Sequence, residues 1–99
     1  MAYCPPELLD DLADVLALVR SWADVVEKKP HVFYARRQPF LHFHQLADGR
    51  RRADMKGRAG WVQLDVPRPI SAARRRALVR ELNKIHAEVA SAAPRPSPR

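Results

Sequence analysis

Apolar residues between positions 6 and 26 recur at spacings of three and four, which places them on one stripe of a helix. Pro6 suits the start of such a helix, and Pro30 marks a point by which it must have ended. The pattern therefore predicts a helix over residues 6–26. Its apolar stripe consists of Leu8, Leu12, Val15, Val19, Trp22 and Val26.

The apolar period changes to two between residues 31 and 66, which indicates short strands. Turn residues at 38–39, 47–49 and 57–60 divide this stretch. The predicted strands cover about 31–37, 40–46, 50–56 and 61–66. Because the connections are so short, neighbouring strands must be antiparallel and the sheet must be a meander.

A second helix is predicted after the last strand. Pro67 and Pro69 stop that strand, Ser71 is a natural N-cap, and an apolar seam continues to about Ala90. The order helix, four strands, helix predicts a two-layer α+β sandwich with both helices on one sheet face and the other face open. Residues 1–92 would form this single domain, and residues 93–99, rich in Pro and Arg, a disordered tail.

The hairpin loops predict which side chains meet on the open face. A three-residue loop at 47–49 sets His42 opposite Asp54 and His44 opposite Arg52. A slip by one residue would mix apolar and polar side chains on both faces, which argues for this register. The pattern leaves open whether Phe33 or Tyr34 joins the face. The expected open face displays His42, His44, Arg52, Asp54, Lys56, Trp61, Gln63 and Asp65.

Charge is distributed unevenly along the chain. The net charge is +7, yet residues 1–27 hold six acids and one base, which leaves 17 bases and five acids for the remainder. A basic excess of this size can attract phosphate backbones or acidic proteins. However, 14 of the 18 bases are arginine, and Ala and Pro are also abundant. Proteins encoded by GC-rich genomes commonly have such a composition without a functional reason. The basic charge therefore either serves binding or reflects composition alone, and the sequence leaves both interpretations open.

The chain shows no sign of secretion or membrane insertion. Cys4 is the only cysteine, so no internal disulfide can form. Asp10, Asp11 and Asp14 interrupt the first apolar stretch, which argues against a signal peptide or a membrane span there. The simplest expectation is a bacterial-type cytoplasmic protein.

The leading functional hypothesis is a binding domain for nucleic acid or another anionic partner. An exposed sheet with Trp61, basic side chains and an aromatic residue from the first strand could stack bases and neutralise phosphates. No RNP, KH or zinc-finger signature accompanies it. The residues expected to contribute are His42, His44, Arg50, Arg51, Arg52, Asp54, Lys56, Trp61 and Gln63.

A metal or small-ligand site is the first alternative. His42 and His44 point the same way from one strand, and Asp54 could be a third ligand for a divalent metal ion. His31 and His86 could join only if the fold brings them close. The competing interpretation makes His42 and Asp54 a cross-strand pair that supports the sheet by a few tenths of a kcal/mol.

Catalysis and protein binding are further alternatives. His42 and Asp54 could form an oriented base, but every serine lies outside the predicted sheet, which argues against an enzyme. The acidic first helix and the basic remainder could favour association between copies of the chain. The face around Trp61 is another candidate protein interface.

The strand segments also resemble a bacterial family. The segments Phe40-Leu41-His42-Phe43-His44, Ala53-Asp54 and Gly60-Trp61-Val62 resemble, in order, the His-x-His, Asp-containing and Gly-Trp-Val strands of the small luciferase-domain family. The resemblance covers roughly residues 31–90. In this chain the segment before Gly-Trp-Val is shorter, and a family histidine expected there is missing.

The predicted topology is also similar to that of MmcQ/YjbR-like proteins and, more remotely, to frataxin. Both similarities concern the fold, and a fold does not imply a function. A frataxin-like iron site would need an acidic first helix, for which Asp10, Asp11 and Asp14 are available.

Overall fold

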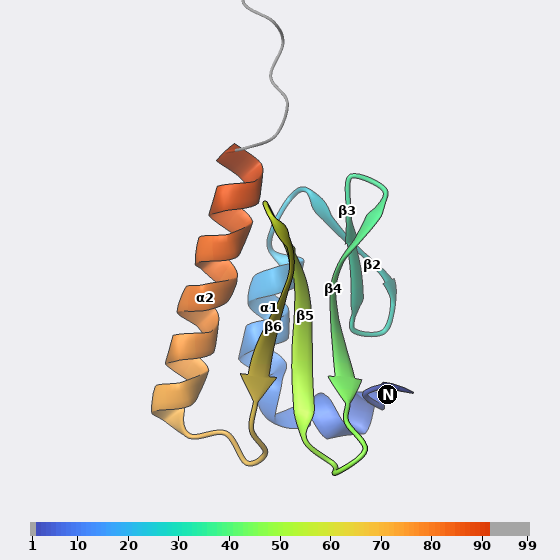
Figure 1. Cartoon of the computed structure of the whole chain (residues 1–99), viewed down its shortest axis with the longest axis vertical. Coiled ribbons are helices and arrows are strands. Elements are labelled where there is room, and N and C mark those ends of the chain that lie inside the picture. Colours follow the sequence, from blue (N-terminus) through green and yellow to red (C-terminus); the bar gives the residue numbers. More distant parts are fainter. Residues whose placement is uncertain (1, 92–99) are drawn as a thin grey trace, which may run out of the picture.

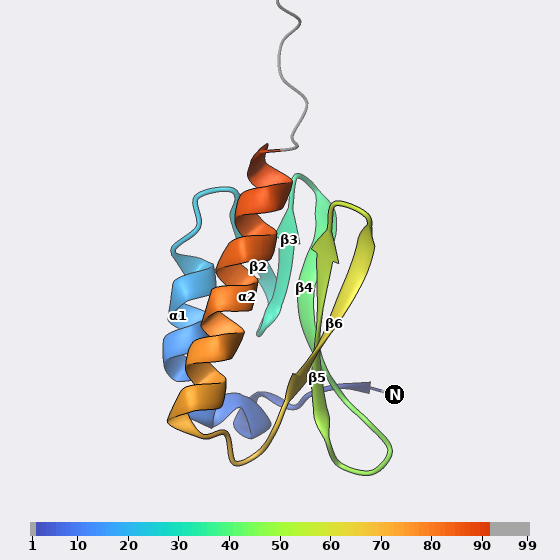
Figure 2. The ribbon, with the colours of Figure 1, turned by 60° about the vertical axis from the view of Figure 1, so that its left-hand side comes forward.

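Two helices lie against one side of an antiparallel sheet in the computed structural model, which describes residues 2–91 (Figures 1 and 2). This confirms the predicted α+β class. The predicted tail at 93–99 lies outside the described residues, as do positions 1 and 92. The elements are β1 (Ala2–Tyr3), the 3-10 helix η1 (Pro6–Leu12), α1 (Ala13–Arg20), β2 (Val25–Lys29), β3 (Val32–Ala35), β4 (Gln38–Gln45), β5 (Arg51–Gly57), β6 (Gly60–Val66) and α2 (Ala72–Ser91).

The sheet has more strands than the four predicted. Its main path is β2-β3-β4-β5-β6, and all neighbours are antiparallel. The short β1 pairs with the end of β4 that extends past β3, where Tyr3 lies opposite His44. The N-terminal segment therefore comes to lie against the middle of the sheet.

The first predicted helix begins at Pro6 as expected, but its first part is not an α-helix and its predicted end at residue 26 is wrong. Residues 6–12 form a 3-10 helix, and α1 ends at Arg20, where the Ser21 hydroxyl donates a hydrogen bond to the Leu18 carbonyl at 2.5 Å. Residues 25–29 form the edge strand β2 instead. Val25 and Val26 are β-branched and favour a strand, and pairing with β3 provides their backbone with hydrogen-bond partners. The helical spacing of Trp22 and Val26 was therefore coincidental.

The first predicted turn of the sheet is also displaced. Arg36 and Arg37 form the β3–β4 turn, with φ values of 54° and 68°, while Pro39 lies within β4. Two central residues with positive φ are typical of a type I′ hairpin turn. Phe33 is buried in the core, whereas Tyr34 lies on the opposite face, which resolves the ambiguity in this strand.

The predicted register of the last three strands is confirmed. His42 pairs with Asp54, and His44 pairs with Arg52. In the next hairpin, Asp54 pairs with Gln63, Lys56 with Trp61 and Arg52 with Asp65. The second loop is shorter than the predicted 57–60, because Gly57 and Gly60 pair directly.

The core fills the space between the sheet and the helices, and it gathers buried side chains from η1, α1, the sheet and α2. Ser71 caps α2 as predicted, since its hydroxyl accepts a hydrogen bond from the Arg74 backbone N–H at 3.1 Å. Both helices pack on one side, so the other face of the sheet stays free of helices (Figure 2). Within residues 2–91 no helix has the length and apolar character needed to cross a membrane.

Candidate functional site

Three potential metal ligands meet on the open sheet face. His42 and His44 are two residues apart on β4, so the pleat directs both side chains to this face. Asp54 on β5 lies directly opposite His42. One ligand atom from each residue can be chosen so that all three atoms lie within 4.8 Å of one another. The predicted cluster therefore forms.

The Asp54 carboxylate contacts both His44 and Arg52. It lies 3.3 Å from Nε2 of His44 and accepts hydrogen bonds from Arg52, at 2.7 Å from Nε and 3.0 Å from Nη2. Asp54 is only 8% exposed, so these contacts replace the water that a surface carboxylate would bind. Arg52 compensates the Asp54 charge, and Asp54 in turn fixes the orientation of the His44 ring.

Both imidazoles keep one nitrogen without a partner. Nδ1 of His42 and Nδ1 of His44 are buried, and neither has a hydrogen-bond partner in the described part of the chain. Burial lowers the pKa of His42, and the neighbouring His44 lowers it further. Asp54 raises this pKa, and Arg52 has a smaller lowering effect. A neutral imidazole carries a lone pair, and a buried unsatisfied polar atom costs about 1–3 kcal/mol. The neutral His42 ring thus has a lone pair that a ligand could use.

Two aromatic side chains enclose the histidines. The Tyr3 ring lies 5.5 Å from that of His42 and 5.2 Å from that of His44, and the Trp61 ring lies 5.0 Å from His42. The two histidine rings are nearly perpendicular, with centroids 4.6 Å apart. The sequence did not indicate Tyr3, because a two-residue strand has too few positions to show alternation.

The remaining predicted residues of the face occupy its β6 side. Lys56 lies over the Trp61 ring, with Nζ 5.5 Å from the ring centroid. Gln63 is exposed and lies opposite Asp54. Both residues are therefore on the expected face but do not belong to the histidine cluster.

Of the two predicted flanking arginines, Arg51 is buried and cannot contact a ligand on the face, whereas Arg50 is exposed. Arg50 bonds Asp48 within the β4–β5 loop, with Nε 2.6 Å from Oδ2. Arg51 points into the interior and is 1% exposed. Strict alternation along β5 indicates this orientation, because Arg52 faces outward and its neighbour must face the core.

The other two histidines lie elsewhere in the fold. His31 is near Glu27 and Arg20. His86 on α2 stacks on Trp22, with ring centroids 3.9 Å apart, and contacts Asp24 at 2.9 Å. Neither can complete the cluster on β4 and β5, so residues 2–91 offer three side chains for an ion.

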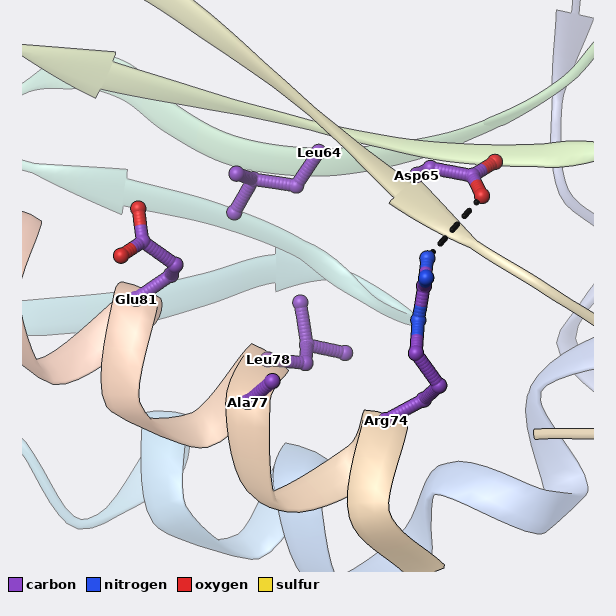
Figure 3. A pocket seen from close by; sticks show the side chains of 6 residues that line it. All are labelled: Leu64, Asp65, Arg74, Ala77, Leu78 and Glu81. Atoms are coloured by element: carbon purple, nitrogen blue, oxygen red, sulfur yellow. Dashed lines mark hydrogen bonds and ion pairs between the residues drawn. The ribbon is translucent and has the colours of Figure 1, made fainter. Parts of the chain in front are cut away.

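A separate groove lies between β6 and α2 (Figure 3). Its volume is about 250 Å³, and the Arg74–Asp65 ion pair, at 3.3 Å, closes one end. Leu64 and Leu78 form its apolar floor. The groove contains none of the three clustered ligands, so it is not part of the candidate site.

Comparisons of the chain with protein-family models, with curated proteins and with solved structures find no match. The resemblance to the luciferase-domain family and the topological similarity to MmcQ/YjbR-like proteins therefore stay predictions.

Proposed function

We propose that this domain binds one divalent transition-metal ion through His42, His44 and Asp54. The observation that carries the proposal is the convergence of two imidazoles and one buried carboxylate, whose ligand atoms lie within 4.8 Å of one another. Imidazole and carboxylate are ligands that zinc and non-haem iron sites use, in sets of three that leave coordination positions open.

The spacing of the three groups is compatible with a metal centre. Ligand atoms around tetrahedral Zn²⁺ lie roughly 3.3 Å apart, given bonds of about 2.0–2.1 Å. Nε2 of His44 and Oδ2 of Asp54 already lie 3.3 Å apart. The full set lies within 4.8 Å, so the three ligand atoms must move closer together when an ion binds.

Arg52 opposes binding of a cation and at the same time positions the carboxylate. Hydrogen bonds from Arg52 reach both oxygens of Asp54, so an ion must share that carboxylate with a guanidinium. Oδ2 also faces Nε2 of His44 at 3.3 Å, so an ion must replace that contact or bind Oδ1, which accepts a hydrogen bond from Arg52 and has a second lone pair. We therefore expect moderate affinity, in contrast to the very tight binding of structural zinc sites.

The test is a zinc titration of chelator-treated, untagged protein by calorimetry. We expect one ion per chain, with binding lost in the double variant His42→Ala/His44→Ala and weakened at least tenfold in Asp54→Asn. His86→Gln is the matched control, because it removes an imidazole outside the cluster and should bind zinc like the wild type. Circular dichroism checks that each variant is folded.

Two results would overturn the proposal. One is the absence of stoichiometric zinc binding by folded wild-type protein. The other is equal zinc affinity in the folded double variant and in His86→Gln. In either case the His44–Asp54 contact would be a structural pair of the sheet.

A further inference from the structure

Two lysine–aromatic pairs stand at opposite sides of the open sheet face. Nζ of Lys28 lies over the Tyr34 ring, 5.6 Å from its centroid, where β2 meets β3. Nζ of Lys56 lies 5.5 Å from the Trp61 ring, where β5 meets β6. Each pair combines a flat π-surface with a positive charge, which are the two features that recognise a base and its phosphate.

Aromatic rings also occupy the middle of the face. Tyr3 lies beside His42, and His42 lies beside Trp61, with ring centroids 5.5 Å and 5.0 Å apart. Tyr3 is 50% exposed and Trp61 is 44% exposed, which is unusual for side chains of this size. The rings thus form a row across β1, β4 and β6 on the open face of the sheet.

A hollow of about 340 Å³ continues this row toward the β2 edge of the sheet. Tyr3 and Tyr34 provide its aromatic walls, Val32 contributes an apolar surface, and Lys28 and Lys29 provide positive charge. Its volume is within the usual range for sites that hold small organic ligands. The hollow can take a planar, anionic unit.

The lysines on this face keep their charge available. Among the described residues, Lys28, Lys29 and Lys56 form no ion pair with a carboxylate. The acids of the face, in contrast, are already engaged: Arg52 binds Asp54, and Arg74 binds Asp65. Basic side chains therefore outnumber acidic ones around the aromatic row.

From these observations we infer that the open sheet face binds single-stranded nucleic acid. Bases stack on Tyr34, Tyr3 and Trp61, while the lysines neutralise phosphates. The repetition of the lysine–aromatic pair on both sides of the face fits a polymer with a repeating base and phosphate better than it fits one small ligand. A duplex hides its base faces and cannot use the aromatic row.

The test is fluorescence anisotropy with a labelled 12-nucleotide oligo-dT at low and moderate salt, with EDTA present. EDTA makes this test independent of the metal proposal. We expect salt-sensitive binding, a loss of at least fivefold in affinity for Trp61→Ala and for Tyr34→Ala, and weaker binding of a duplex of equal length. Lys28→Gln and Lys56→Gln should each reduce the slope of log affinity against log salt by about 0.7.

Lys84→Gln is the matched control, because it removes one exposed lysine from α2, on the helix side of the sheet. It should leave the affinity within twofold of the wild type. The inference is overturned if oligo-dT does not bind at low salt, if the duplex binds equally well, or if Lys84→Gln weakens binding as much as Lys56→Gln. It is also overturned if folded Trp61→Ala and Tyr34→Ala bind like the wild type, because binding would then depend on charge alone.

Discussion

The carboxylate of Asp11 and the guanidinium of Arg51 form a two-point ion pair between η1 and β5, with Nη1–Oδ1 at 2.7 Å and Nη2–Oδ2 at 3.0 Å. Arg51 also donates hydrogen bonds to the carbonyls of Leu8, Val66 and Pro67. All five of its N–H donors thus have acceptors, which makes it possible to bury this charge. Hydrogen bonds from Arg51 in turn lower the pKa of the Asp11 carboxyl.

Replacement of Arg51 should be the most destabilising charge change in the protein. We expect Arg51→Met to lower the free energy of unfolding by about 3–5 kcal/mol, because it leaves Asp11 and three carbonyls without their donor. Urea denaturation measures this change. Arg50→Met is the control and should cost less than about 1 kcal/mol, since the Arg50–Asp48 pair is exposed. Equal losses in the two variants would contradict the role assigned to Arg51.

Glu27 should make stability depend on pH in the acidic range. Hydrogen bonds from Arg20 lower the pKa of Glu27 from 4.5 to about 2, despite some burial, and the His31 backbone N–H contributes. A depressed pKa in the folded state gives stability that is present above pH 4.5 and lost as the pH falls towards 2.

The measurement compares wild type with Glu27→Gln by urea denaturation between pH 7 and pH 3. The variant should be less stable by about 1 kcal/mol at pH 7, a figure reduced for the solvent exposure of Arg20. The difference should shrink below pH 4.5. Glu81→Gln is the control, because Glu81 has no ion pair among the described residues. A difference that does not change with pH would contradict the assignment.

The β3–β4 turn offers a stabilising substitution. Arg36 and Arg37 both have positive φ, which costs a residue with a Cβ atom about 1 kcal/mol or more. We expect Arg36→Asn/Arg37→Gly to raise the free energy of unfolding by about 1–2 kcal/mol, because these residues favour a type I′ turn. Arg58→Asn/Ala59→Gly in the β5–β6 turn is the control. It should give no gain, since neither residue there has positive φ.

Arg52 should limit the metal affinity of the proposed centre. Its removal takes away the guanidinium that compensates the negative charge of Asp54 in the described part of the chain. We expect Arg52→Gln to bind zinc about tenfold more tightly than the wild type in the same calorimetric titration, at some cost in stability. Arg50→Gln removes an equal charge from the neighbouring loop and should leave the affinity unchanged. Weaker zinc binding by folded Arg52→Gln would contradict this prediction and show that Arg52 acts mainly by positioning Asp54.

Local rules predicted much of the candidate site. Alternation along β4 and β5, together with the loop at 47–49, was enough to place His42 opposite Asp54. The same rules failed where an element was too short or its pattern ambiguous. Tyr3 belongs to a two-residue strand, and Val26 continued a helical spacing by coincidence. The sequence around Tyr3 or Val26 contains no other pattern strong enough to have indicated a strand there.

The sequence by itself determined the antiparallel pairing of β4, β5 and β6, because short loops and a period of two leave little choice of register. Only the tertiary structure shows which acidic and basic side chains form ion pairs. Asp10, Asp11 and Asp14, which suggested association between copies or an iron site, pair within the chain with Arg68, Arg51 and Arg75. Such pairs join segments far apart in sequence, so only the packing of η1 and α1 near β5 and the start of α2 could bring them together.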